Sequence, residues 1–124
     1  MIAHIILFEP RADLTAAQRA EVAAALGRAA AAAPSVRSCR IGRRVTHGLP
    51  GYEQGMTQDF QFAAVLEFDD VDGLREYLRH PAHAGIGAHF TGAAAAALAY
   101  DYEIVSLDEA SKDARERGER PRAG

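Results

Sequence analysis

The alternation of residues in the segment 60–68 is the feature that most restricts how this chain can fold. Apolar side chains occupy every second position, and Gln61 and Glu67 fall among the residues between them. Side chains of a β-strand point alternately to its two faces, so the pattern predicts a strand with one strongly apolar face. The apolar positions are Phe60, Phe62, Ala64, Leu66 and Phe68.

Three other segments are predicted to be strands: residues 2–8, 36–45 and 100–107, which are rich in β-branched or aromatic residues. Helices are predicted between them. Thr15 is a suitable N-cap for a helix over residues 16–33, with Gln18 placed to complete a capping box. A second helix begins after Asp69 or Asp70 and is interrupted at Pro81, and a third runs from about residue 83 to residue 98.

This order of elements, β-α-β-β-α-(α)-β, is the split βαβ pattern of the ferredoxin-like α+β fold. It predicts a four-stranded antiparallel sheet with helices on one face. The other face would be bare, and two apolar stripes are candidates for it. A homodimer that packs sheet against sheet would cover such a surface. The two stripes are His4/Ile6/Phe8 and Phe60/Phe62/Phe68.

Length and composition fit one domain, which we place at residues 1–107. Much of the 48% hydrophobic content is alanine, so self-association would help to complete the core. The net charge of −3 gives no reason to expect nucleic-acid binding, and no apolar run is long enough to span a membrane. The single cysteine, Cys39, excludes an internal disulfide and suits a reducing cytoplasm.

Residues 108–124 are charged and have no apolar face. They predict a disordered or frayed tail, with a few turns of exposed helix up to Gly118 as the alternative.

The segment 77–87, Tyr-Leu-Arg-His-Pro-Ala-His-Ala-Gly-Ile-Gly, concentrates reactive groups around a proline. His83 and Tyr77 are six residues apart across the helix break and can face one cavity. A histidine with a pKa near neutrality suits a general base, and a tyrosine hydroxyl can orient it or donate a proton. The alternative is structural: His83 would cap the third helix and Tyr77 would belong to the core. His80, before Pro81, is expected to end the second helix.

His4 lies within an apolar strand, and it is either a core histidine or a partner for His83. A metal site built from His80, His83 and His89 is disfavoured, because Pro81 separates the first two and no cysteine or carboxylate cluster accompanies them. Cys39 is interpreted as a strand residue, and no phosphate-binding loop is present.

Four separated motifs resemble the stress-responsive A/B barrel (Dabb) family: residues 1–8, 65–68, 77–87 with its His80-Pro81-Ala82-His83, and 99–102. The resemblance covers roughly residues 1–105. It implies a dimeric α+β barrel, in which two ferredoxin-like sheets face each other. It also implies a ligand pocket between sheet and helices in each subunit.

Some members of that family are polyketide cyclases that act without a cofactor. By this resemblance His83 would be the catalytic acid or base, assisted by Tyr77 and accompanied by His4. The ligand would be a small apolar or polyketide-like molecule, and no metal or other cofactor is implied. The alternatives are a non-catalytic, stable stress-responsive dimer and, third, a haem- or oxygen-dependent monooxygenase. The side chains expected to line the pocket are Ile6, Phe8, Leu26, Phe62, Phe68 and Ile86.

Overall fold

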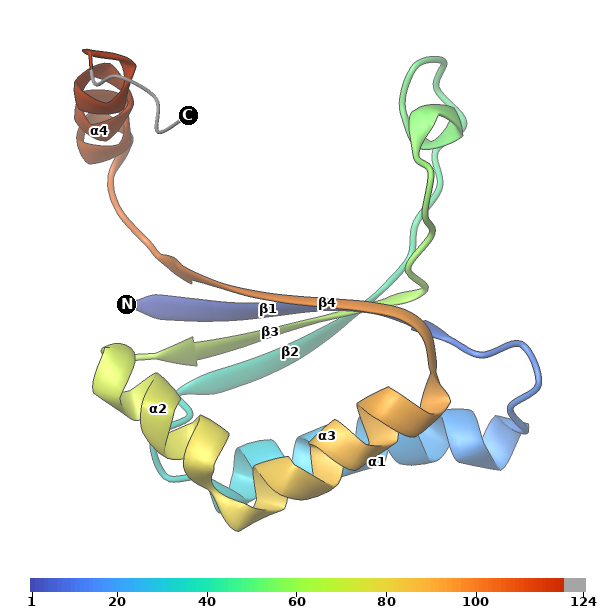
Figure 1. Ribbon diagram of the computed structural model, residues 1–124. Helices are drawn as coiled ribbons and strands as arrows, with labels where there is room; N and C mark the ends of the chain where they lie inside the picture. Colours follow the sequence, from blue (N-terminus) through green and yellow to red (C-terminus); the bar gives the residue numbers. More distant parts are fainter. Residues whose placement is uncertain (120–124) are drawn as a thin grey trace.

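The structure, a computed structural model, describes residues 1–119 and contains one antiparallel sheet in the order β2-β3-β1-β4 (Figure 1). Helices α1, α2 and α3 cover one face of it. This is the ferredoxin-like α+β fold, as the order of elements predicted. The elements are β1 (Ile2–Pro10), α1 (Ala16–Ala32), β2 (Ser38–Arg43), the short 3₁₀ helix η1 (Glu53–Gly55), β3 (Phe62–Phe68), α2 (Val71–Arg79), α3 (Pro81–Ala93), β4 (Ala94–Glu103) and α4 (Leu107–Glu119).

The ends of the helices follow the capping signals in the sequence. The Thr15 hydroxyl accepts a hydrogen bond from the backbone N–H of Gln18 at 3.1 Å, and the Gln18 side chain accepts from the backbone N–H of Thr15 at 2.8 Å. Asp70 caps α2 by accepting from the N–H of Gly73 at 2.8 Å. These bonds satisfy backbone donors that have no partner within the helix.

His80 and Pro81 form the junction between α2 and α3. The backbone of His80 is extended, as expected before a proline, and Pro81 occupies the first turn of α3. The His80 ring Nδ1 accepts a hydrogen bond from the N–H of Ala82 at 3.1 Å. His80 therefore ends one helix and caps the next.

The prediction that residues 94–98 are helical is wrong. α3 ends at Ala93, and the alanines that follow begin β4, which pairs with β1 from Ala94 to Glu103. Alanine has a strong helix propensity, but propensity is a weak preference that tertiary context overrides. Here the exposed edge of β1 supplies backbone partners along ten residues of chain.

The prediction for the bare sheet face is also wrong. His4, Ile6 and Phe8 are buried beneath the helices together with Phe68, and Phe62 faces the same side. Phe60 lies before β3 begins. Both faces of β1 are apolar, so the alternation could not show which face the helices would cover. The apolar residues on the open face are Ile5, Leu7, Val65, Leu98, Tyr100 and Tyr102.

Two segments project from the open side of the sheet, at opposite ends of it (Figure 1). One is the connection between β2 and β3, residues 44–61, which contains η1. It is closed at its base by the N–H of Arg44 donating to the carbonyl of Gln61 at 2.8 Å, and His47 and Glu53 lie 3.1 Å apart within it. The other is α4, a helix whose side chains are exposed up to Gly118. Residues 120–124 lie outside the described part.

Replacing Leu66 with alanine tests the position of the core. Leu66 is 0% exposed in the centre of the sheet, and Leu66→Ala should lower the free energy of unfolding by about 2–5 kcal/mol because it leaves a cavity. The matched control is Leu49, which is 58% exposed in the 44–61 segment. Leu49→Ala should change the free energy of unfolding by less than about 0.5 kcal/mol. Equal losses of stability in Leu66→Ala and Leu49→Ala, measured by urea denaturation, would contradict this position of the core.

Candidate functional site

A cleft of about 370 Å³ lies between α3 and β4, beside the first strand. His4, His83 and Asp101 are its titratable side chains, and nearly all of the remaining wall is apolar. A concave apolar site with a few converging polar groups is the usual form of a small-molecule site. We call it the histidine cleft. The other residues that line it are Ile6, Leu78, Ile86, Gly87, Phe90, Ala97, Leu98 and Ala99.

His4 reaches the cleft through the pairing of β1 with β4, which places it opposite Asp101. The two side chains are joined by a hydrogen bond of 2.5 Å between His4 Nδ1 and Asp101 Oδ1. The His4 side chain is almost completely buried, whereas that of Asp101 is 41% exposed. A carboxylate accepts from Nδ1–H, so in a neutral ring Nε2 is the acceptor.

Tyr77 lies between the two histidines. Its ring meets the rings of His83 and His4 edge-on, with centroids 5.0 Å and 6.2 Å away. Tyr77 is only 1% exposed, and its hydroxyl has no hydrogen-bond partner among the described residues. Burial raises the pKa of Tyr77 to about 12. The ring thus holds both imidazoles in place, while the hydroxyl bonds to neither.

His83 lies in the first turns of α3, half-buried at the wall of the cleft. Burial lowers the pKa of His83, and the proximity of His4 lowers it further. Its imidazole is therefore neutral at physiological pH and has a lone pair available to accept a proton.

The pocket residues expected from the sequence fall into three groups. Ile6 and Ile86 line the histidine cleft. Ile6 also lines a separate cavity beside α1, together with Phe8, Leu26 and Phe62. Phe68 is completely buried in the core, where its ring packs against that of Tyr77 at 5.5 Å.

Other reactive side chains lie outside the cleft. Cys39 packs against the core, where burial raises the pKa of its thiol, and Arg40 pairs with Glu67 at 2.7 Å. In residues 1–119 there is no group of three or more histidine, cysteine or acidic side chains placed to hold a metal ion. No helix within those residues is long and apolar enough to cross a membrane.

Sequence reasoning gave no role to Asp101 or Phe90. The sequence did contain a signal for Asp101, because it lies between Tyr100 and Tyr102 in a predicted strand. Alternation along a strand places its side chain on the face opposite to the two tyrosine rings. Only the pairing of β4 with β1 shows that this face is the one with His4. Phe90 had no such signal, because its position depends on how α3 packs on the sheet.

Comparison with known proteins identifies the family. A family model for the stress-responsive A/B barrel domain (Dabb) matches residues 2–104. The chain belongs to this family. A search of curated protein sequences gave no match.

Solved structures share the fold of this Dabb protein. A dimeric ferredoxin-like protein of unknown function from Thermobifida fusca has 29% identity and a TM-score of 0.66, with 83% of this chain and 90% of that chain covered. The hydroxynitrile lyase of Passiflora edulis has 18% identity and a TM-score of 0.74, covering 86% and 94%. A dimeric protein of unknown function from Bacteroides fragilis has 24% identity and a TM-score of 0.59, covering 83% and 95%.

The lowered pKa of His83 predicts how pH affects stability. As pH falls through about 6.5, the ordinary pKa of histidine, the unfolded chain takes up a proton more readily than the native state does. His83 therefore disfavours the native state increasingly in acid. We expect the stability of the wild type relative to His83→Gln to decrease between about pH 7.5 and pH 5 in urea denaturation. A difference that stays constant across this range would contradict the shift.

Proposed function

We propose that this protein binds a small, largely apolar molecule in the histidine cleft and carries out cofactor-independent proton transfer of the lyase or cyclase type. The observation that carries the proposal is the convergence of His83, His4 and Asp101 on one otherwise apolar cleft. An apolar wall strengthens the electrostatic interactions of the few polar groups in such a site.

Each residue has a distinct task in this proposal. His83, neutral and half-buried, removes a proton from the ligand, either from a carbon beside a carbonyl or from a hydroxyl group. His4 is the second group that can hold or return a proton, and Asp101 fixes the orientation of its ring through the hydrogen bond to Nδ1. Tyr77 is a positioning residue that acts through its ring, which contacts both imidazoles. The proposal rests on the ring because the hydroxyl has no hydrogen-bond partner among residues 1–119. The expected role of that hydroxyl as an orienting donor stays a prediction.

The fold shared with a hydroxynitrile lyase supports testing the lyase form first. In that reaction a base takes the hydroxyl proton of a hydroxynitrile, the carbon–cyanide bond breaks, and the carbonyl compound forms. The departing cyanide takes the proton back from the base. A neutral histidine beside a second, carboxylate-supported histidine can serve both steps.

The decisive experiment follows the release of benzaldehyde from mandelonitrile by ultraviolet absorbance. The wild type should accelerate it, and His83→Ala should lower the rate by about 10²- to 10⁴-fold, the usual contribution of a general base. His89→Ala, on the same helix but outside the cleft, is the matched control and should keep the wild-type rate. Tyr77→Phe should also stay active, because it removes a hydroxyl that has no hydrogen-bond partner in residues 1–119.

Two results would refute parts of this proposal. A loss in Tyr77→Phe as large as that in His83→Ala would assign the hydroxyl a chemical role. If mandelonitrile is not cleaved, a thermal-shift screen of small carbonyl and polyketide-like compounds decides between another substrate and the non-catalytic alternative. A compound that stabilises wild type and His83→Ala equally would argue against the cleft as its binding site.

We also propose that the protein is a homodimer, joined through the open face of its sheet. Leu98, Tyr100 and Tyr102 are 41%, 55% and 52% exposed on that face, and a monomer rarely leaves so large an apolar surface uncovered. Similar structures from Thermobifida fusca and Bacteroides fragilis are described as dimeric.

A charge on this face tests the dimer. Tyr100→Asp should give a monomer mass by light scattering at micromolar concentration, because an unpaired carboxylate would be buried at the interface. Val71→Asp makes a similar change on the helical side, at an exposed position of α2, and should leave the dimer intact. A wild type that is already monomeric would refute the proposed assembly.

A further inference from the structure

The apolar surface on the open face of the sheet continues past the end of β4. The exposed apolar side chains of that strand occupy every second position, and Ile104, 54% exposed, holds the next position of the same alternation. Its backbone N–H donates to the carbonyl of Met1 at 2.9 Å, which keeps it in line with the strand. Val105 and Leu107 follow, and Leu107 is 87% exposed. The apolar surface therefore extends beyond the sheet into the segment that comes next.

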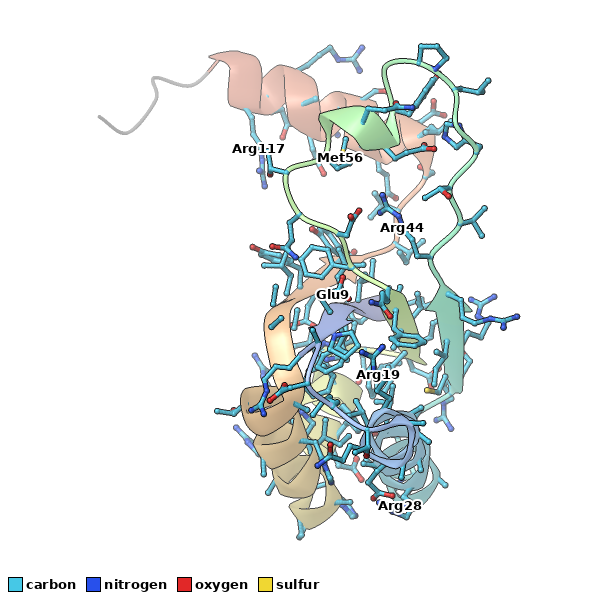
Figure 2. The ribbon with its side chains drawn as sticks, turned by 90° about the vertical axis from the view of Figure 1, so that its right-hand side faces the viewer. Glu9, Arg19, Arg28, Arg44, Met56 and Arg117 are labelled. Atoms are coloured by element: carbon cyan, nitrogen blue, oxygen red, sulfur yellow. The ribbon has the colours of Figure 1, made fainter. Side chains whose placement is uncertain are left out.

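That segment, residues 104–119, projects from the open side of the sheet and ends in α4 (Figure 1). We call it the C-terminal arm. Figure 2 shows α4 on the open side, with its axis across the direction of the strands and Arg117 towards its end. The match to the Dabb family model ends at residue 104, so nearly all of the arm lies outside the part of the chain that the family shares.

The arm lacks a packing surface within the described chain, because every residue from 101 to 118 is exposed. α4 does begin with a capping bond, in which the Ser106 hydroxyl accepts from the N–H of Glu109 at 3.1 Å. The helix has only 13 residues, however, and Gly118 is one of them. An isolated helix of about this length is marginal in water, and helices in proteins gain most of their stability from packing. A second chain would supply the missing surface.

α4 has an uncharged side that suits such a surface. With about 3.6 residues per turn, its uncharged residues fall within one side of the helix, and the charged residues occupy the rest of the circumference. Leu107 gives this side its one large apolar group, and the small residues allow close approach to a partner. The residues of the uncharged side are Leu107, Ala110, Ser111, Ala114 and Gly118.

We propose that the C-terminal arm grips a second copy of this chain, with Leu107 and the uncharged side of α4 packed on the partner's surface. This inference rests on the homodimer proposed above, which is joined through the open face. Continuity favours a second copy as the partner, because the apolar stripe passes directly from that face into the arm. In a twofold dimer the same contact is made twice, so both arms contribute to the affinity.

Leu107→Asp tests the grip in the full-length chain. Aspartate is favourable in the first turn of a helix, so the change keeps α4 helical and removes its one large apolar contact. The dissociation constant of the dimer, measured by sedimentation equilibrium, should rise at least about tenfold. Val71→Asp adds the same charge at an exposed apolar position on the helical side, and should leave the dissociation constant unchanged.

Hydrogen exchange followed by mass spectrometry measures whether the arm is bound. Amides of residues 107–119 should exchange at least about tenfold more slowly in the wild-type dimer than in Tyr100→Asp, the variant expected to be a monomer. Amides of α1 should exchange alike in both proteins, which would show that the variant is folded. Wild type diluted below its dissociation constant is the second monomeric reference.

The outcomes separate this inference from the homodimer itself. A monomeric wild type would overturn both. A dimer that is as tight in Leu107→Asp as in the wild type would overturn the arm alone, and so would an equal loss in Val71→Asp, which would indicate a general effect of charge. Exchange in α4 that is equally fast in dimer and monomer would show an unbound arm. Equal protection in both would show that the chain's own residues cover it.

Discussion

The structure depends on the pairing of β1 with a strand on each side. β3 and β4 both run antiparallel to it, so every other residue of β1 has a fixed neighbour on the helical face. His4 consequently lies between Leu66, a core residue, and Asp101, a carboxylate at the edge of the sheet. A shift of one residue in this register would move every side chain of β1 to the other face. The same pairing that closes the hydrophobic core therefore also assembles the polar part of the site.

Tyr77 connects the core to the site. Its ring contacts Phe68 on one side and the two imidazoles on the others. Its hydroxyl is buried and has no partner within the described part of the chain, which costs free energy that the packing of the ring must offset. The His80-Pro81 junction contributes to this arrangement, because it ends α2 just after Tyr77 and starts α3 just before His83. A backbone break, and not a shared helix face, brings these two side chains together.

The helical face of the sheet contains two spaces of different character. The histidine cleft is open, is bordered by α3 and β4, and contains titratable side chains. The cavity between α1 and the sheet is smaller and apolar, and Arg19 is the one charged side chain among the described residues that line it. Phe90 borders both, so the packing of α3 against the sheet determines how they are divided. On the opposite face, the exposed tyrosines and leucine of β4 lie between two projecting segments, residues 44–61 and α4 (Figure 1). The proposed ligand binding and the proposed association with a second copy therefore use different faces of one sheet.

The sequence by itself determined the order of elements, and with it the ferredoxin-like fold, because alternation, capping residues and prolines are local signals. It also singled out His83, Tyr77 and His4. The sequence did not determine which face of β1 the helices cover, since both faces are apolar, or that the alanines after Ala93 form a strand, since their helix propensity was overridden by pairing with β1. The partnership of His4 with Asp101 and the division of the pocket at Phe90 were decided by the tertiary structure alone. Each depends on residues far apart in the chain whose contact is set by strand register and helix packing, which no local pattern encodes.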